Sequence, residues 1–180
     1  MNKLALALAS TALALSIPLT PAMATVETAE ARSVALEAAE QARADMIEAF
    51  GDKELKAGQY VWRDGLSGEP RVVISLSDQR AYLYRGDSLA AVASISTGTD
   101  EHPTPTGIFP ILAKKTMHRS KKYDDAPMPF MQRLDNYGIA LHAGHNPGRP
   151  ASHGCIRLPA KFAAKLYGVT EVGSTVYIAA

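Results

Sequence analysis

Residues 71–95 read RVVISLSDQRAYLYRGDSLAAVASI, and this stretch decides the fold class. Apolar runs rich in Val, Ile, Leu and Tyr alternate in it with turn residues at 77–79 and 86–87. Such runs, separated by short turns, predict an antiparallel meander. Its strands are expected at residues 72–76, 81–84 and 89–95.

Further short strands and one helix are expected after the meander. Apolar runs predict strands at residues 108–112, 139–141 and 176–178. Pro110 indicates an edge or a bulge in the first of them. Residues 160–167 follow Pro159 and precede Gly168, which is typical of a short helix with proline at its start and glycine at its end. The fold class is therefore mostly β.

Residues 113–136 show no strand pattern. The stretch is long, basic and polar, and it contains the pairs Lys114-Lys115 and Lys121-Lys122. A connection of this length in a small domain is usually a lid, a binding loop or disordered. We expect a loop here, with both lysine pairs on its solvated faces.

The first 24 residues have the pattern of a secretory signal peptide. Lys3 supplies a positive charge, residues 4–19 are largely apolar, and residues 22–24 read Ala-Met-Ala, which fits a cleavage site. A transmembrane anchor is the alternative. It is disfavoured because polar residues and prolines interrupt the run, and about 20 continuous apolar residues are needed to span a bilayer. We expect an exported protein without a stable membrane anchor.

A helical lead-in is expected between the signal peptide and the strands. Residues 25–50 are rich in Ala and Glu and lack Pro and Gly, which predicts a helix that ends at Gly51. Its apolar positions form only a loose stripe, so we expect it to pack weakly. The glycine-rich segment around Tyr60 and Trp62 is typical of a linker at the domain edge. The expected organisation is a signal peptide at 1–24, a helical lead-in and linker at 25–70, and one folded domain at 71–180.

The charge balance excludes one broad class of partner. The chain has 19 Lys and Arg against 18 Asp and Glu, and loss of Lys3 with the signal peptide leaves no net charge. A neutral protein has no bulk electrostatic attraction for nucleic acid or for an anionic membrane. We therefore expect no nucleic-acid partner and look for function in a local site.

The single cysteine of the chain lies in a segment rich in histidine and glycine. Residues 141–158 read LHAGHNPGRPASHGCIRL. A lone thiol in an exported protein has no internal disulfide partner, which indicates a reactive group. Cys155 becomes a good nucleophile when a histidine within reach takes its proton. His142, at the end of a predicted strand, is the candidate base, and Gly154 leaves the backbone open beside the thiol, where N–H groups can face an oxyanion.

Two other interpretations of these residues stay open. Cys155 can be a buried thiol that acts as a small hydrophobe. A zinc site can be built from His142, His145, His153 and Cys155, although their spacing matches no standard template. The combination of export with several histidines favours the nucleophile, and we expect no metal.

The remaining polar residues receive weaker assignments. His153 shares a face with Cys155 if the segment is extended. Arg157 is suited to binding a substrate carboxylate through its guanidinium fork, with a surface ion pair as the alternative. His102 and His118 are expected to be solvated.

The segment resembles the signature of a known family. Residues 152–157, SHGCIR, with His142 upstream, resemble the motif of the L,D-transpeptidase (YkuD-type) catalytic domain. The resemblance extends over about residues 71–179. It includes the hairpin at 75–82 (SLSDQRAY), the STG at 96–98 with the TPTG at 104–107, and Met128-Pro129-Phe130, which is similar to a substrate-facing loop of the family.

The resemblance implies a β-rich sandwich with a short helix and an acyltransferase of peptidoglycan that needs no cofactor. In this family a cysteine attacks the carbonyl of the third stem-peptide residue, a diamino acid, and expels D-Ala. The acyl group then passes to an amine. By position, Cys155 is the nucleophile, His142 is the general base, and the backbone carbonyl of Ala143 orients His142. The positions implied for oxyanion and substrate binding are His153, Gly154, Ser152 and Arg157.

Two positions depart from the family pattern. The family often has glycine directly after the first histidine, where this chain has Ala143, and only a backbone carbonyl is needed there. The family has asparagine two residues after the cysteine, where this chain has Arg157. The second departure bears on how donor and acceptor are recognised.

Several alternatives stay open at this point. The acceptor can be a second stem peptide, a lipoprotein lysine, a free D-amino acid or water. With water, the same site acts as an L,D-carboxypeptidase or as a crosslink-cleaving amidase, and a non-catalytic wall-binding module is the alternative from another class. The expected partners are peptidoglycan stem peptides, the expected state is a monomer, and the expected location is the periplasm or cell wall. Penem-type and carbapenem-type β-lactams are expected to inhibit.

Overall fold

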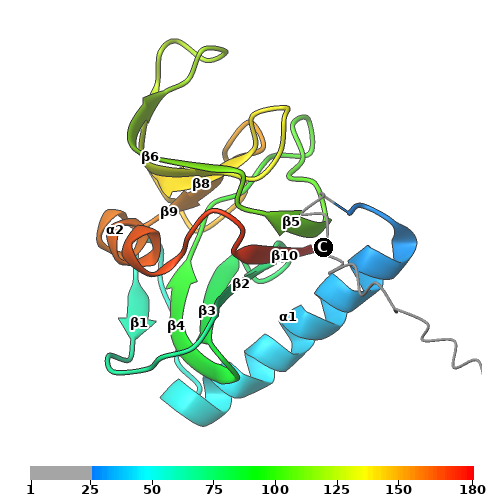
Figure 1. The fold of residues 1–180 in the computed structure, drawn as a ribbon, viewed down its shortest axis with the longest axis vertical. Helices are drawn as coiled ribbons and strands as arrows, with labels where there is room; N and C mark the ends of the chain where they lie inside the picture. The colour runs from blue at the N-terminus through cyan, green and yellow to red at the C-terminus, as the bar shows by residue number, and fades with distance from the viewer. Residues whose placement is uncertain (1–25) are drawn as a thin grey trace, which may run out of the picture.

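The computed structural model describes residues 26–180 and consists of two β-sheets and two helices in that range. Figure 1 shows helix α1 along one side of the larger sheet. The predicted signal peptide lies outside the described residues. The mostly β fold class expected from the sequence is confirmed. Neither helix in residues 26–180 has the length and apolarity needed to cross a membrane.

The larger sheet has six strands in the order β1-β4-β3-β2-β10-β5. The strands are β1 (Tyr60–Trp62), β2 (Pro70–Ser75), β3 (Arg80–Arg85), β4 (Ser88–Ser94), β5 (Gly107–Pro110) and β10 (Thr175–Ala179). The predicted meander is the antiparallel run β2-β3-β4. Strand β10 pairs parallel with β2 and antiparallel with β5. Pro110 ends β5, which is the edge strand that its proline indicates.

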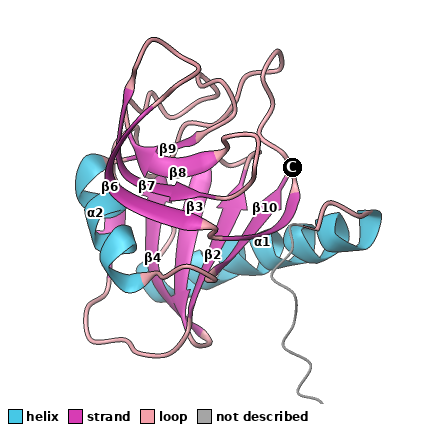
Figure 2. Cartoon of the chain, turned by 45° about the horizontal axis from the view of Figure 1, so that its top comes forward, coloured by secondary structure: helices cyan, strands magenta, loops and turns pink. Residues whose placement is uncertain are grey.

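The smaller sheet has four strands in the order β6-β7-β8-β9. They are β6 (Ala113–Arg119), β7 (Pro127–Arg133), β8 (Ala140–Ala143) and β9 (Ile156–Leu158), and Figure 2 shows them arranged as one layer. Strands β8 and β9 pair in parallel. The other neighbours pair antiparallel.

The expectation of a loop at residues 113–136 is wrong. Strands β6 and β7 form a hairpin there, and only residues 120–126 turn between them. Most side chains of β6 are at least partly exposed, so this edge strand lacks the apolar alternation that marks a half-buried strand. Lys114 is only partly exposed, and its ammonium donates to the carbonyls of Tyr167 and Thr170 at the end of the second helix.

The central strands of the larger sheet are buried on both faces. Val73, Tyr82 and Val92 face one core together with the first helix. Their neighbours along the strands, such as Val72 and Leu83, face a second core that contains residues of the smaller sheet and of the second helix. Burial on both faces explains why these strands have continuous apolar runs in the sequence.

Helix α1 (Ala29–Phe50) covers the first of these cores. Thr28 caps its start by accepting a hydrogen bond from the Ala31 N–H at 3.2 Å, and the helix ends before Gly51 as predicted. The expectation of weak packing is wrong. The buried face of the helix consists of Ala31, Ala35, Ala39, Ala42 and Met46. Alanines give little apolar signal in a sequence, but they let the helix backbone lie close to the sheet.

Helix α2 (Ala160–Val169) packs on the core face of the smaller sheet. It starts after Pro159 as predicted and continues through Gly168 to Val169. The Thr170 hydroxyl donates to buried Gln132 of β7 at 2.6 Å. This contact, together with Lys114, ties the end of the helix to the sheet that carries the candidate site.

Candidate active site

Cys155 and His142 lie on the same face of the smaller sheet. In the parallel pair β8–β9, Leu141 is opposite Ile156 and His142 is opposite Arg157. Leu141 and Ile156 are fully buried in the core between the sheets. Because side chains alternate along a strand, His142 and Arg157 lie on the outer face. Cys155 immediately precedes β9 and is two residues from Arg157, which makes it a diagonal neighbour of His142.

The connection between β8 and β9 brings these residues together. Parallel strands cannot be joined by a tight turn and need a crossover of about a dozen residues, which residues 144–155 supply. The crossover is fixed to the end of β4 and the segment that follows it. Asn146 donates to the Ser94 carbonyl at 2.7 Å, and the Ser96 hydroxyl donates to the Arg149 carbonyl at 2.6 Å. The site is therefore built on strand ends and a pinned loop.

The imidazole of His142 is held in one tautomer. Its Nδ1 is 2.9 Å from the carbonyl oxygen of Ala143. A carbonyl oxygen only accepts hydrogen bonds, so Nδ1 carries the proton and Nε2 keeps a free lone pair. Burial lowers the pKa of His142, and the Arg157 cation lowers it further, against the opposite effect of the Ala143 carbonyl. The ring is therefore a neutral base at neutral pH.

The thiol of Cys155 is half-buried in an apolar environment. Its Sγ lies 3.4 Å from the carbonyl oxygen of Gly138, to which it donates. Burial raises the pKa of Cys155, and the negative charge of Asp135 raises it further, against the opposite effects of the Ala140 backbone and the Arg157 cation. The resting thiol is therefore protonated.

Two methionines of β7 border the thiol. Met128 and Met131 are buried and form a small cluster with Ala140, against which Cys155 packs. An odd separation normally places two strand residues on opposite faces. Phe130 has a φ of 54°, in the left-handed region, which interrupts the alternation between them. The Met128-Pro129-Phe130 segment is thus part of a strand beside the thiol.

Asp135 is a residue of this region that sequence reasoning missed. Its side chain is only 6% exposed. One carboxylate oxygen accepts hydrogen bonds from the backbone N–H groups of Tyr137, Gly138 and Ile139, at 2.8–2.9 Å. This turn holds the Gly138 carbonyl against the thiol. Aspartate before a glycine-containing turn is the sequence signal that indicates it.

The backbone on either side of Gly154 is held by a buried serine. The Ser152 hydroxyl donates to the Cys155 carbonyl at 2.6 Å and accepts from the Gly154 N–H at 3.1 Å. Gly154 has a φ of +106°, and a Cβ there would lie 2.7 Å from the Ile139 side chain. The Gly154 N–H is therefore engaged within the protein, and only glycine fits its position.

His153 lies at the surface and contacts other rings. It is exposed and stacks on Tyr123, from the turn between β6 and β7, with ring centroids 4.4 Å apart. The ring of His102 contacts the ring of His153 in a tilted arrangement, with centroids 4.9 Å apart. His102 is thus exposed but in contact with another ring. The stack joins the tip of the β6–β7 hairpin to the segment that carries Cys155.

The other candidate residues are placed as follows. Arg157 is half-buried, and its guanidinium donates to the Ala151 carbonyl at 3.1 Å. His145 is exposed on the crossover. Within residues 26–180, no three His, Cys, Asp or Glu side chains gather in a group that could hold a metal ion.

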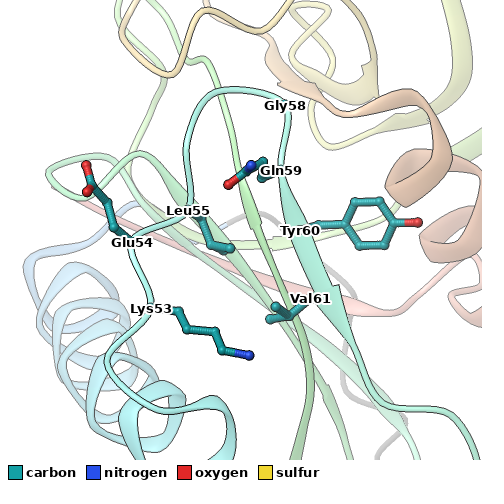
Figure 3. A pocket seen from close by; sticks show the side chains of 7 residues that line it. All are labelled: Lys53, Glu54, Leu55, Gly58, Gln59, Tyr60 and Val61. Carbon is teal, nitrogen blue, oxygen red and sulfur yellow. The ribbon is translucent and has the colours of Figure 1, made fainter.

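A hollow of about 500 Å³ lies between the segment after α1 and strand β1 (Figure 3). It is lined by Lys53, Glu54, Leu55, Gly58, Gln59, Tyr60 and Val61. It shares no residue with the His142–Cys155 region. We give it no part in the chemistry.

Comparison with known proteins gives a family and a set of similar folds. The family model of the YkuD L,D-transpeptidase catalytic domain matches residues 69–178. No curated protein sequence matches the chain. The solved structures below are each less than 25% identical to the chain and establish the likeness of fold.

Three solved structures illustrate that likeness. An L,D-transpeptidase from Mycobacterium smegmatis has a TM-score of 0.58 at 22% identity, over 62% of this chain and 59% of that one. An L,D-transpeptidase from Stackebrandtia nassauensis has a TM-score of 0.57 at 24% identity, over 74% and 64%. L,D-transpeptidase 3 from Mycobacterium tuberculosis, in complex with a faropenem-derived adduct, has a TM-score of 0.56 at 22% identity, over 62% and 61%. This chain thus spans about three fifths of the length of these proteins.

Proposed function

Because the chain belongs to the L,D-transpeptidase catalytic-domain family, we propose that it is a peptidoglycan acyltransferase in which Cys155 is the nucleophile and His142 is the general base. The observation that carries the proposal is the pairing of groups on one sheet face. A half-buried thiol lies diagonally across from a buried imidazole whose Nε2 is free. Nucleophilic catalysis by cysteine needs a base beside the thiol, and this pairing supports His142 in that role.

The first step forms a thioester. His142 Nε2 takes the thiol proton, and Sγ attacks the carbonyl carbon of the third stem-peptide residue. The negative charge moves onto that carbonyl oxygen in a tetrahedral intermediate. When the intermediate collapses, the C–N bond to D-Ala breaks, and His142 returns the proton to the leaving amine.

The oxyanion is stabilised by the backbone N–H of Cys155 itself. The Gly154 N–H already donates to the Ser152 hydroxyl. Within residues 26–180, the Cys155 N–H donates to no other protein group. An N–H group fixed beside the reacting carbonyl stabilises the developing charge without reorganisation. The Cys155 N–H is surrounded by the backbone of Gly154, by the Ser152 hydroxyl that holds this backbone, and by the exposed His153.

The second step releases the acyl group. His142, neutral again after the leaving group has departed, takes a proton from the acceptor amine as it attacks the thioester. A new amide bond forms, the C–S bond breaks, and the proton returns to the thiolate. Arg157 lies directly opposite His142 on the sheet and is suited to binding a carboxylate of the donor or acceptor peptide.

The resting enzyme holds a neutral thiol and a neutral imidazole. The pKa of His142 is lowered and the pKa of Cys155 is raised, mainly by burial in both cases. Both shifts disfavour a thiolate–imidazolium pair. Proton transfer therefore accompanies attack on the bound donor, which protects the resting thiol from adventitious oxidation.

The location and domain limits follow as parts of the same proposal. Residues 1–24 direct export and are removed, and the mature chain acts in the periplasm or at the cell wall without a cofactor. Residues 71–180 carry the chemistry. Because one similar structure holds a faropenem-derived adduct, we expect the Cys155 thiol to open the ring of penems and carbapenems.

Product analysis tests the proposal. The mature chain is incubated with a disaccharide-tetrapeptide, and free D-Ala and crosslinked dimers are measured. Transpeptidation yields D-Ala and dimers, whereas hydrolysis yields D-Ala and a free tripeptide without dimers. Release of no D-Ala by freshly reduced protein refutes both transpeptidation and carboxypeptidase activity on this donor.

A further inference from the structure

Thr104 belongs to the TPTG segment, to which the proposed function gives no role. Its side chain is 5% exposed. The hydroxyl accepts a hydrogen bond from the Gly98 N–H at 2.9 Å and donates one to the Gly154 carbonyl at 2.8 Å. A hydroxyl has one proton to donate, so the bond to Gly154 uses it. Thr104 therefore connects the STG segment to the residue before the nucleophile.

The bond to Gly154 fixes the direction of the Cys155 N–H. The Gly154 carbonyl and the Cys155 N–H belong to one peptide unit, and residues 26–180 contain no cis peptide bond. In a planar trans peptide the C=O and N–H bonds point in opposite directions. A hydrogen bond on the carbonyl side therefore turns the N–H to the side away from Thr104.

The next peptide unit is held in the same way. The Cys155 carbonyl accepts from the Ser152 hydroxyl. Thr104 and Ser152 thus hold the two peptide units that flank Cys155. Residual rotation of the peptide between Gly154 and Cys155 is limited by both contacts.

Gly98 of the STG segment packs closely against the TPTG segment and against Gly154. A Cβ on Gly98 would lie 2.1 Å from the His102 carbonyl oxygen and 3.0 Å from the Gly154 Cα. The two glycine backbones are therefore in direct contact, and Thr104 is the side chain that bridges them. The Thr97 N–H and hydroxyl are both bonded to the buried Gln79 side chain, which anchors the STG segment from the other side.

We propose that Thr104 is a positioning residue for oxyanion stabilisation, which holds the peptide between Gly154 and Cys155 so that the Cys155 N–H faces the reacting carbonyl. The inference rests on the proposed function, because it assigns a role within that reaction. Donation to the carbonyl also polarises the amide and strengthens its N–H as a donor. Loss of one oxyanion donor lowers kcat by about 100-fold to 1000-fold, and a misdirected donor retains part of its effect. We expect a loss of about 10-fold to 100-fold.

The test separates acyl transfer from simple thiol reactivity. Thr104→Val keeps the shape of the side chain and removes the hydroxyl, Thr104→Ser keeps the hydroxyl, and Thr106→Val is the matched control two residues along the same loop. Two rates are measured for each: acylation of Cys155 by imipenem, which passes through an oxyanion, and alkylation by iodoacetamide, which does not. Turnover of the disaccharide-tetrapeptide is measured in parallel.

The expected result is selective. Thr104→Val slows acylation and kcat by about 10-fold to 100-fold and leaves alkylation within twofold, while Thr104→Ser and Thr106→Val stay near wild type. Unchanged acylation in Thr104→Val overturns the inference. Equal losses of acylation and alkylation also overturn it, because they indicate general disruption of the site. A wild-type chain that turns over no tetrapeptide contradicts the proposed function instead, and the imipenem rates still report on Thr104.

Discussion

The histidine and the cysteine of the site differ from their exposed counterparts in opposite directions. His142 is harder to protonate and Cys155 is harder to deprotonate, because burial disfavours the charged form of each. Arg157 lowers the pKa of both groups and Asp135 raises that of Cys155. The pH dependence of the reaction therefore reports directly on this environment.

The acid limb of kcat/KM is predicted to lie below the ordinary histidine range of about 6.5. The base must be neutral to act, and its lowered pKa keeps it neutral at more acidic pH. In His142→Gln, alkylation of the thiol by iodoacetamide is predicted to titrate above the usual cysteine value of about 8.5. An acid limb at or above the ordinary histidine range would contradict the lowered pKa of His142.

Asp135→Asn is predicted to increase thiol alkylation at neutral pH. The variant removes the negative charge that raises the pKa of Cys155, so the thiolate forms at lower pH. An asparagine oxygen can still accept from the turn. Asp135→Ala removes that acceptor and is predicted to lower the free energy of unfolding by about 1–3 kcal/mol. Alkylation rates against pH and urea denaturation measure the two effects.

The control for this prediction is Asp124→Asn. Asp124 is exposed in the turn between β6 and β7. If both variants give the same alkylation profile as wild type, Asp135 does not act on the thiol.

The candidate catalytic residues could be proposed from the sequence. The residues that hold them in position could not. Cys155 and His142 stand out by residue type, and His142 also by its place at the end of a predicted strand. Thr104 acts on Gly154 across 50 positions, and Met128 joins Met131 beside the thiol because Phe130 interrupts the alternation of the strand between them. Contacts of this kind depend on tertiary packing, which no local pattern encodes.

At the scale of elements, the sequence predicted the strands whose apolar runs are buried on both faces. It missed β6, because an exposed edge strand with several charged residues has no apolar period. It also missed β7 and the three-residue strands β1 and β9. It predicted the existence of α1 but not its packing. The alanine face of α1 lies on Tyr84 and its neighbours, and the Tyr84 hydroxyl donates to Asp45 of the helix at 2.5 Å.

Ala42→Leu is predicted to destabilise the protein by about 1–3 kcal/mol through overpacking. Ala42 is fully buried between α1 and the larger sheet, so a larger side chain must displace the helix. Ala44→Leu is the matched control on the exposed face of the same helix, with an expected change within about 0.5 kcal/mol. Urea denaturation compares the two. Equal stabilities would mean that the helix packs as loosely as its sequence suggests.

At the scale of the whole molecule, the folded unit extends beyond the family match. The match begins at residue 69, whereas α1 and β1 precede it. Helix α1 covers Val73, Tyr82 and Val92, and β1 pairs with β4 at the edge of the larger sheet. Residues 26–68 thus form one face of the protein that carries the site.

A chain that starts at Glu69 is predicted to be much less stable than one that starts at Val26. Its larger sheet would expose an apolar face to water, and exposed apolar patches of this kind promote association. Size-exclusion chromatography and thermal unfolding compare the two chains. A monomeric fragment with an unchanged midpoint would show that residues 26–68 are a separable lead-in.

The most direct test of cysteine acyl transfer is the intact mass of the mature chain, acid-quenched during turnover of a disaccharide-tetrapeptide. The proposal predicts an adduct of the disaccharide-tripeptide acyl group on wild-type protein, mapped to Cys155, and no adduct on Cys155→Ala. Release of D-Ala without any adduct, or an adduct of the same mass on Cys155→Ala, would contradict it.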